Sequence, residues 1–417
     1  MQFVKPQGNN MAETEMLSRE FVEDFSRSRF EPEWLLDMRL KAWEIFQSKR
    51  VENYIYGLGI ATSLKDIDFN TESSDTDALV KNKPEKAVIM ELGEAVKKYP
   101  DAVRKHLFSK FFSADPANVD KFSALHAALW KSGIFIYLPE NSSETKPIYV
   151  DLLSKGFSSN HILIVAEPNS RAVFVSIEKT GQPNPAANPE SHVLNNSAVE
   201  IYAAEGSEIK YGNVQMFSEN VFNLTERTGV VEKDASITWI ICDLGSCLTK
   251  SDLTTRLVGQ GASVKNISLF FGHANQQFDF SANAIHECSD TTSNIIAKGA
   301  LNHKSKSIYR GLVKILQDAA RCSGSQKEDT ILLSSDAEAD AIPNLEIDNN
   351  DVKCSHAATI GHIDAEKLFY LMSRGLPENL ARQKIVEGFF DPVIAQIPIE
   401  RLQEELRNMI SERSSGE

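Results

Sequence analysis

The segment DVKCSHAATIG at residues 351–361 places a cysteine and a histidine two positions apart. Its alternating pattern predicts a strand, in which Cys354 and His356 leave the same face with their α-carbons roughly 6.6 Å apart. Thiolate and imidazole are common protein ligands for iron, zinc and copper. Two donors do not close a tetrahedral site, so this pair needs further donors before it can hold a metal.

The face that carries this pair is otherwise apolar, because Val352, Ala358 and Ile360 share it and the residues between them point the other way. In a core, a cysteine on such a face acts as a small hydrophobic residue, and a histidine beside it is hydrogen-bonded locally. The other interpretation is that a second protein buries this face. The residues alone leave both interpretations open.

The remaining cysteines are expected to have structural roles. His286 and Cys288 repeat the two-residue spacing in reverse order, within a segment that we expect to be a buried coil. Cys242 and Cys247 flank a predicted turn, and Cys322 is predicted to be a loop thiol. None of these positions is predicted to bind metal.

The composition narrows the classes of protein and partner. The 417 residues carry a formal net charge of −14 without a basic cluster, so a nucleic-acid partner is not expected. No apolar run is long enough for a membrane span, and the first residues lack a signal-peptide pattern. The five cysteines have no paired spacing, which favours free thiols in a reducing compartment, and we expect a cytoplasmic location.

Several catalytic motifs are absent from the sequence. It contains no G-x-x-x-x-G-K-[ST] phosphate-binding loop, no G-x-S-x-G, no H-E-x-x-H and no G-x-G-x-x-G. We therefore expect that the chain has no nucleotide site of its own. No residues point to a flavin site.

The residue pattern divides the chain into three regions. Residues 1–145 are predicted to be mostly helical, with an exposed polar loop at 62–85. Residues 146–363 contain short β-branched runs separated by small polar clusters. Residues 364–417 are predicted to be helical again, with Asp364 as the N-cap of the first helix.

A loose repeat runs through the central region. A turn, a small residue and an alternating strand recur from Glu205, Lys233 and Gln260, at spacings of 28 and 27 residues. A coil of this length suits a solenoid, in which stacked coils bury the inner face that one coil cannot bury alone. A β-sandwich also gives short strands and turns, and the repeat does not exclude it. The positions expected to point inward share a mid-strand place in the repeat: Ile209, Ile237 and Val264.

The sequences of several segments resemble those of one known family. KFSALHAALWKSGIFIYLP (121–139), YRGLVKI (309–315) and the run from PNLEI through DVKCSHAATIG to LFYLMSRGL and IVEGFF are similar to the SufB/SufD family of iron–sulfur cluster assembly proteins. Within that family, the C-S-H motif on this strand is typical of the SufD branch. Ile347 stands where the SufB branch has a cysteine.

This resemblance implies a fold and a function. The fold is mainly β, a right-handed parallel β-helix between N-terminal and C-terminal helical segments, which decides between solenoid and sandwich. The implied function is that of a non-catalytic scaffold subunit that pairs with SufB through the β-helices and binds the ATPase SufC through the C-terminal helices. The resulting complex assembles and transfers iron–sulfur clusters, and an isolated chain could also form a homodimer.

The resemblance also implies site residues. It places His356, supported by Cys354, at a transient cluster site shared with a SufB cysteine at the interface. The C-terminal segment from 364 is expected to dock the ATPase through apolar residues that include Phe369, Leu371 and Phe389.

A β-helix enzyme acting on polysaccharide is the competing function. Such enzymes use paired carboxylates on an exposed groove, and residues 334–351 are rich in acidic residues. We expect this acidic segment to be a solvated turn instead.

Overall fold

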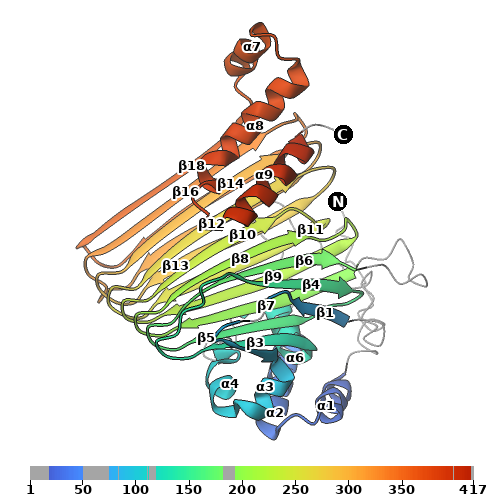
Figure 1. The fold of residues 1–417 in the computed structure, drawn as a ribbon, viewed down its shortest axis with the longest axis vertical. Coiled ribbons are helices and arrows are strands. Elements are labelled where there is room, and N and C mark those ends of the chain that lie inside the picture. Colours follow the sequence, from blue (N-terminus) through green and yellow to red (C-terminus); the bar gives the residue numbers. More distant parts are fainter. Residues whose placement is uncertain are drawn as a thin grey trace, which may run out of the picture.

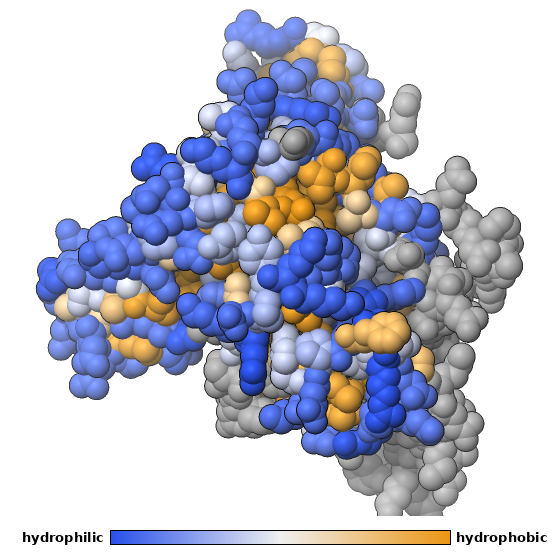
Figure 2. Space-filling view, turned by 60° about the horizontal axis from the view of Figure 1, so that its bottom comes forward, coloured by the Kyte–Doolittle hydropathy of each residue, from blue (hydrophilic) through white to orange (hydrophobic). Residues whose placement is uncertain are grey.

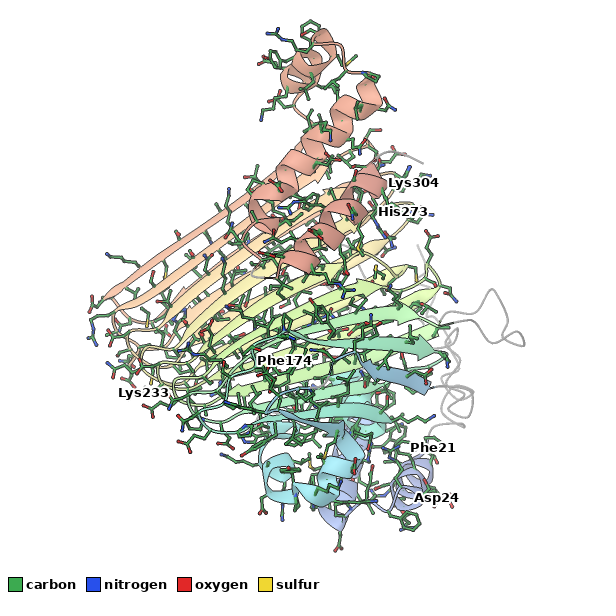
Figure 3. The ribbon with its side chains drawn as sticks, viewed as in Figure 1. Phe21, Asp24, Phe174, Lys233, His273 and Lys304 are labelled. Atoms are coloured by element: carbon green, nitrogen blue, oxygen red, sulfur yellow. The ribbon has the colours of Figure 1, made fainter. Side chains whose placement is uncertain are left out.

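The computed structural model describes residues 18–49, 75–82, 84–109, 111, 119–181, 193–397 and 399–414. Its body is a stack of long strands, with the N-terminal helices at one end and the last helices extending past the other end (Figure 1). Side chains lie both inside and outside the stack. Phe174 is buried in its interior, and Lys233 lies at an exposed turn (Figure 3).

Two nine-stranded sheets form this stack in the described residues. The first has the order β1-β4-β6-β8-β10-β12-β14-β16-β18, and the second has the order β17-β15-β13-β11-β9-β7-β5-β3-β2. Consecutive strands therefore alternate between the sheets from β3 onwards. The strands are β1 Asp75–Val80, β2 Val88–Glu91, β3 Ser132–Leu138, β4 Ile148–Lys155, β5 Asn160–Ala166, β6 Arg171–Thr180, β7 Val193–Ala203, β8 Glu208–Met216, β9 Val221–Val231, β10 Ser236–Asp243, β11 Leu248–Leu257, β12 Ser263–Gly272, β13 Gln277–His286, β14 Thr292–Leu301, β15 Lys306–Ile315, β16 Cys322–Leu332, β17 Glu338–Ile347 and β18 Val352–His362.

The pairing directions identify the architecture as a parallel β-solenoid. All pairings among β3 to β18 are parallel. Only the two strands at the N-terminal end, β1 on β4 and β2 on β3, pair antiparallel. The solenoid prediction is therefore confirmed, and the sandwich is excluded.

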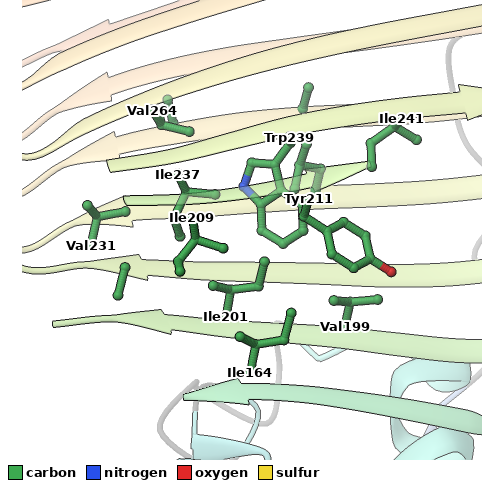
Figure 4. Packing of buried hydrophobic residues seen from close by; sticks show 14 of the residues in the cluster. Ile164, Val199, Ile201, Ile209, Tyr211, Val231, Ile237, Trp239, Ile241 and Val264 are labelled. Atoms are coloured by element: carbon green, nitrogen blue, oxygen red, sulfur yellow. The ribbon is translucent and has the colours of Figure 1, made fainter. Parts of the chain in front are cut away.

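The interior of the solenoid is a column of apolar side chains. The three residues predicted to point inward lie in register on β8, β10 and β12, with Ile209 opposite Ile237 and Ile237 opposite Val264. All three are buried in the same cluster, where Tyr211 and Trp239 stack edge to face beside them (Figure 4). Burying one such aliphatic side chain stabilises the fold by about 1.5–3 kcal/mol, which explains why the coils stay in register.

The predicted loop at 62–85 contains a strand. Strand β1 pairs with β4 along its whole length, and Thr76 is buried while Val80 packs against the interior cluster. The polar composition concealed this strand, because its stability comes from pairing with a partner 70 to 80 positions away. Residues 81–82 and 84–85 belong to no helix or strand, as predicted, and 62–74 and Lys83 lie outside the described residues.

The N-terminal helices cover the outer face of the second sheet at its N-terminal strands, β3 to β9. They are α1 Arg19–Ser28, α2 Glu33–Ser48, α3 Leu92–Lys98, α4 Pro100–His106 and α6 Lys121–Leu129. Asp120 caps α6 by accepting from the backbone N–H of Phe122, 2.7 Å away. The Arg39 guanidinium pairs with Glu31 at 2.7 Å and donates to two backbone carbonyls at the end of α6. Figure 2 shows the face with this end turned forward, where hydrophilic residues surround separate hydrophobic patches.

The C-terminal helices are α7 Ala365–Ser373, α8 Glu378–Ile394 and α9 Glu400–Ser414. Helices α8 and α9 pack on the outer face of the first sheet, where Phe390 stacks on Phe271 with ring centroids 6.3 Å apart. Asp364 caps α7 as predicted, accepting from the N–H of Glu366 at 2.9 Å. No residue of α7 is buried, and this helix projects from the body (Figure 1).

Candidate functional site

The two ends of the solenoid differ. At the N-terminal end, the antiparallel strands β1 and β2 and the helices close the stack. At the other end, β17 and β18 are the last strands of their sheets, each with a neighbour on one side only. Among the described residues, no strand lies beyond them, so their outer edges expose backbone N–H and C=O groups that can pair with another chain.

Cys354 and His356 lie on this final coil. On β18, Cys354 is in register with Gly324 of β16, and His356 is in register with Gln326. Gly324 and Gln326 are buried and point inward, so both members of the Cys–His pair face the solenoid interior. The predicted shared face is therefore confirmed.

This inward face is only partly covered. Val352 and Cys354 are half-buried and pack against the interior cluster, whereas His356 and Ala358 are exposed and Ile360 is 39% exposed. The reason is that no further coil stacks on β18 among the described residues. This face thus points toward the solenoid interior but is not covered, so it is neither part of a closed core nor an ordinary outer surface.

The electrostatic environment of the pair favours a neutral thiol. Burial raises the pKa of Cys354 above its ordinary value, and the nearby Cys322 adds to this effect. The thiolate is therefore scarce at neutral pH in the isolated chain, because the nucleophilic and metal-binding form needs deprotonation. A cation arriving at this end would favour the thiolate.

The burial and contacts of His286 and the other cysteines are compatible with the structural roles predicted for them, and Cys288 is half-buried just after the end of β13. His286 is buried, with Nδ1 2.7 Å from Thr291 Oγ1 and Nε2 2.8 Å from Ser293 Oγ, and burial lowers its pKa to about 4. Cys242 is buried and Cys247 is half-buried, as predicted for structural thiols. The loop prediction for Cys322 is wrong: it is the first residue of β16, buried, with Sγ 3.1 Å from Thr291 Oγ1. The flanking Arg and Ser concealed that strand start.

Polar residues that the sequence analysis did not single out lie directly beneath the open coil. Gln326 donates to the backbone carbonyl of Asn344 on β17 at 3.1 Å. Glu328 is buried with one carboxylate oxygen unpartnered, and burial raises its pKa to about 7. Together with Tyr309 and Pro343 they line a small cavity. Alternation from Gly324 would have placed both residues inward, because β16 keeps a strict two-residue period.

The described residues do not form a complete metal site. No group of three or more histidine, cysteine, aspartate or glutamate side chains in the described part of the chain is arranged to hold a metal ion. Cys354 and His356 therefore offer two donors at an open end, and any cluster held there needs donors from another molecule.

The residues predicted to dock a partner at the C-terminus are not equivalent. Phe369 on α7 is 72% exposed, and Leu371 is half-buried. Phe389 on α8 is instead half-buried against the chain's own cluster: the Lys298 ammonium lies 4.1 Å from its ring centroid and donates to its backbone carbonyl at 2.6 Å. Helix α7 thus presents the free apolar surface, together with Tyr370 and Met372.

Comparison with known proteins agrees with this architecture. Residues 151–389 match the family described as SUF system FeS cluster assembly, SufBD core domain, and residues 30–150 match the SufBD protein N-terminal region. The chain belongs to the SufBD family. The first match covers more than half of the chain and runs from within β4 through the open coil and α7 into α8.

Curated SufBD relatives match over nearly the full length. Iron–sulfur cluster assembly SufBD family proteins of Staphylococcus haemolyticus and Staphylococcus aureus are each 29% identical over 426 residues, covering 92% of this chain and 90% of the relative. A Staphylococcus epidermidis member is 29% identical over 431 residues with the same coverage. Membership in this family agrees with the expected role in iron–sulfur cluster assembly. None of the helices in the described residues is both long and apolar enough to cross a membrane.

Proposed function

We propose that this SufBD protein is a non-catalytic scaffold subunit of the SufD type, which pairs through its open coil with a SufB-like β-solenoid. The observation that supports this most directly is the unpaired outer edge of both β17 and β18 at the end that carries Cys354 and His356. Unpaired parallel edges join other strands readily, and a second solenoid would extend both sheets at once. The exposed Ile347 and Ile360 would be buried by such an extension.

In this proposal the cluster is cargo held at the junction. His356 supplies one imidazole donor from the exposed part of the inward face, and the partner supplies thiolates, as in mixed His and Cys ligation of other clusters. Cys354 supports the site from a half-buried position. Because the chain offers only two donors, the cluster is bound weakly enough to be passed on.

The energy-dependent part of the cycle falls to another subunit. The sequence has no phosphate-binding loop, so we assign nucleotide binding to a SufC-like ATPase that docks on the C-terminal helices. Helix α7, with Phe369 exposed and no buried residue, is the part of that segment available for docking. The location consistent with this role is the cytoplasm.

The test compares cluster content in the intact complex for His356→Ala, Cys354→Ser and the wild type. His356 is exposed, and serine nearly matches the size of the half-buried Cys354, so both variants should fold and pair normally. We expect His356→Ala to lower the iron and acid-labile sulfide recovered per complex several-fold, and Cys354→Ser to lower them less. Full cluster content and full transfer from the His356→Ala complex would contradict the assignment.

A further inference from the structure

The charge on the solenoid alternates from coil to coil towards the open end. Residues 244–272 carry three basic and one acidic residue, and residues 273–301 carry three acidic and one basic residue. Residues 302–333 then carry six basic and three acidic residues. The final coil, 334–362, carries six acidic residues and one lysine.

Ion pairs between neighbouring coils show that this alternation is used in stacking. Arg256 pairs with Glu287, and Asp279 pairs with Arg310, each joining one coil to the next. Arg321 pairs with Asp290 at 2.7 Å in the same way. Charged side chains on each of these coils therefore pair with side chains of opposite charge on the next coil.

The last two pairs reach the terminal coil. Lys306 lies 3.0 Å from Glu338, and Lys314 lies 2.7 Å from Glu346. The acidic strand β17 is thus neutralised from below at two positions. Its Asp340 stands in register with Ile308, which carries no charge.

The remaining acidic residues form a rim around the open end, which we define as Asp336, Asp340, Asp348 and Asp351. All four are exposed. The segment 334–351 was predicted to be a solvated turn, and most of it is instead β17, the edge strand. The last coil in this alternating series is acidic. A further coil that continued the alternation would therefore carry mainly basic residues.

We propose that the acidic rim selects a partner solenoid whose end strands carry lysines and arginines, and that it disfavours pairing of two copies of this chain. The inference rests on the proposed docking of a second solenoid and adds the charge of its edge. In a two-fold pairing of identical chains the same surface meets itself, so acidic rim would face acidic rim. Like charges across an interface oppose association, whereas complementary charges steer and orient it.

The test uses only this chain. A basic-rim variant, Asp336→Lys with Asp340→Lys and Asp348→Lys, leaves the Glu338 and Glu346 pairs intact. Its control carries Asp24→Lys, Asp37→Lys and Asp101→Lys, three exposed positions on the N-terminal helices, with the same change in net charge. A neutral-rim variant replaces the same three rim aspartates with asparagine.

Sedimentation velocity at low salt measures association of each variant alone and mixed with labelled wild type. We expect the wild type to associate with the basic-rim variant at least about tenfold more tightly than with itself, and added salt to remove this difference. The control variant should associate with the wild type as tightly as the wild type associates with itself. Wild-type self-association as tight as the mixture, and insensitive to salt, would overturn the rim proposal while leaving the docking of the open coil intact. No association in any mixture, including neutral-rim copies with one another, would overturn both.

Discussion

His161 Nε2 lies 3.1 Å from Glu200 Oε2, and both side chains are buried beneath the N-terminal helices. The protonation of this pair follows from its neighbours. His126 Nδ1 lies 2.8 Å from the carbonyl oxygen of Asn196, which can only accept, so Nδ1 carries the proton. Burial lowers the pKa of His161 to about 3, so its ring is neutral; its Nδ1–H donates to His126 Nε2 at 3.1 Å, which leaves the His161 Nε2 lone pair facing Glu200. The Glu200 carboxyl group must therefore supply the proton.

This arrangement predicts a loss of stability at alkaline pH. Burial raises the pKa of Glu200 to about 8, so its contribution to stability is complete below the unfolded value near 4.5 and is lost as pH rises through about 8. Between pH 7 and 9 we expect the free energy of unfolding to fall by about 1–2 kcal/mol on account of this group. In Glu200→Gln this part of the fall should be missing in urea titrations at the two pH values. An identical pH dependence in variant and wild type would show that Glu200 is ionised throughout.

A second prediction concerns the buried Arg39, which pairs with Glu31 and links α2 to the end of α6 through backbone hydrogen bonds. Arg39 is buried and pairs with the nearly buried Glu31, so Arg39→Met removes a donor from two backbone carbonyls and from Glu31, which keeps only Arg29 and Ser26 as partners. Removing one member of a buried pair costs about 3–5 kcal/mol. Thermal unfolding followed by limited proteolysis should show early loss of the N-terminal helices. The control Arg19→Met removes exposed pairs to Glu23 and Glu44 and should leave the unfolding temperature nearly unchanged.

A third prediction compares two glycines on neighbouring parts of the same sheet. A Cβ at Gly299 on β14 would lie 2.0 Å from the Phe270 ring, whereas a Cβ at Gly361 on β18 meets no atom within 4 Å. We expect Gly299→Ala to destabilise the solenoid by about 1–3 kcal/mol through overpacking. Gly361→Ala should change the unfolding midpoint little. Equal effects of the two substitutions in denaturant titrations would mean that the Phe270 side chain can move aside.

A fourth prediction separates docking from folding in the C-terminal helices. Phe369→Ser removes an exposed side chain, so it should weaken binding of the proposed ATPase without lowering the unfolding temperature. Phe389→Ser should lower the unfolding temperature, because the ring packs against Phe390 with centroids 5.2 Å apart. Calorimetric binding and thermal unfolding of both variants provide the measurements. Unchanged ATPase affinity in Phe369→Ser would move the docking surface away from α7.

The amino-acid sequence by itself determined the features that depend on a few neighbouring residues. Two-residue alternation placed Ile209, Ile237 and Val264 inside the solenoid and put Cys354 and His356 on one face, and the structure agrees. These patterns are readable because a strand fixes the side of each residue from its position alone.

Only the tertiary structure decided which of these residues are covered. His356 is exposed and Glu328 is buried although both point inward, because a coil stacks above β16 and none of the described coils stacks above β18. Strand β1 and the edge strand β17 were likewise hidden in polar composition, since each is held by pairing with a strand distant in the sequence or nearly a full coil away. Burial in a solenoid is set by residues about thirty positions away, so local pattern shows the direction of a side chain and stacking decides its surroundings.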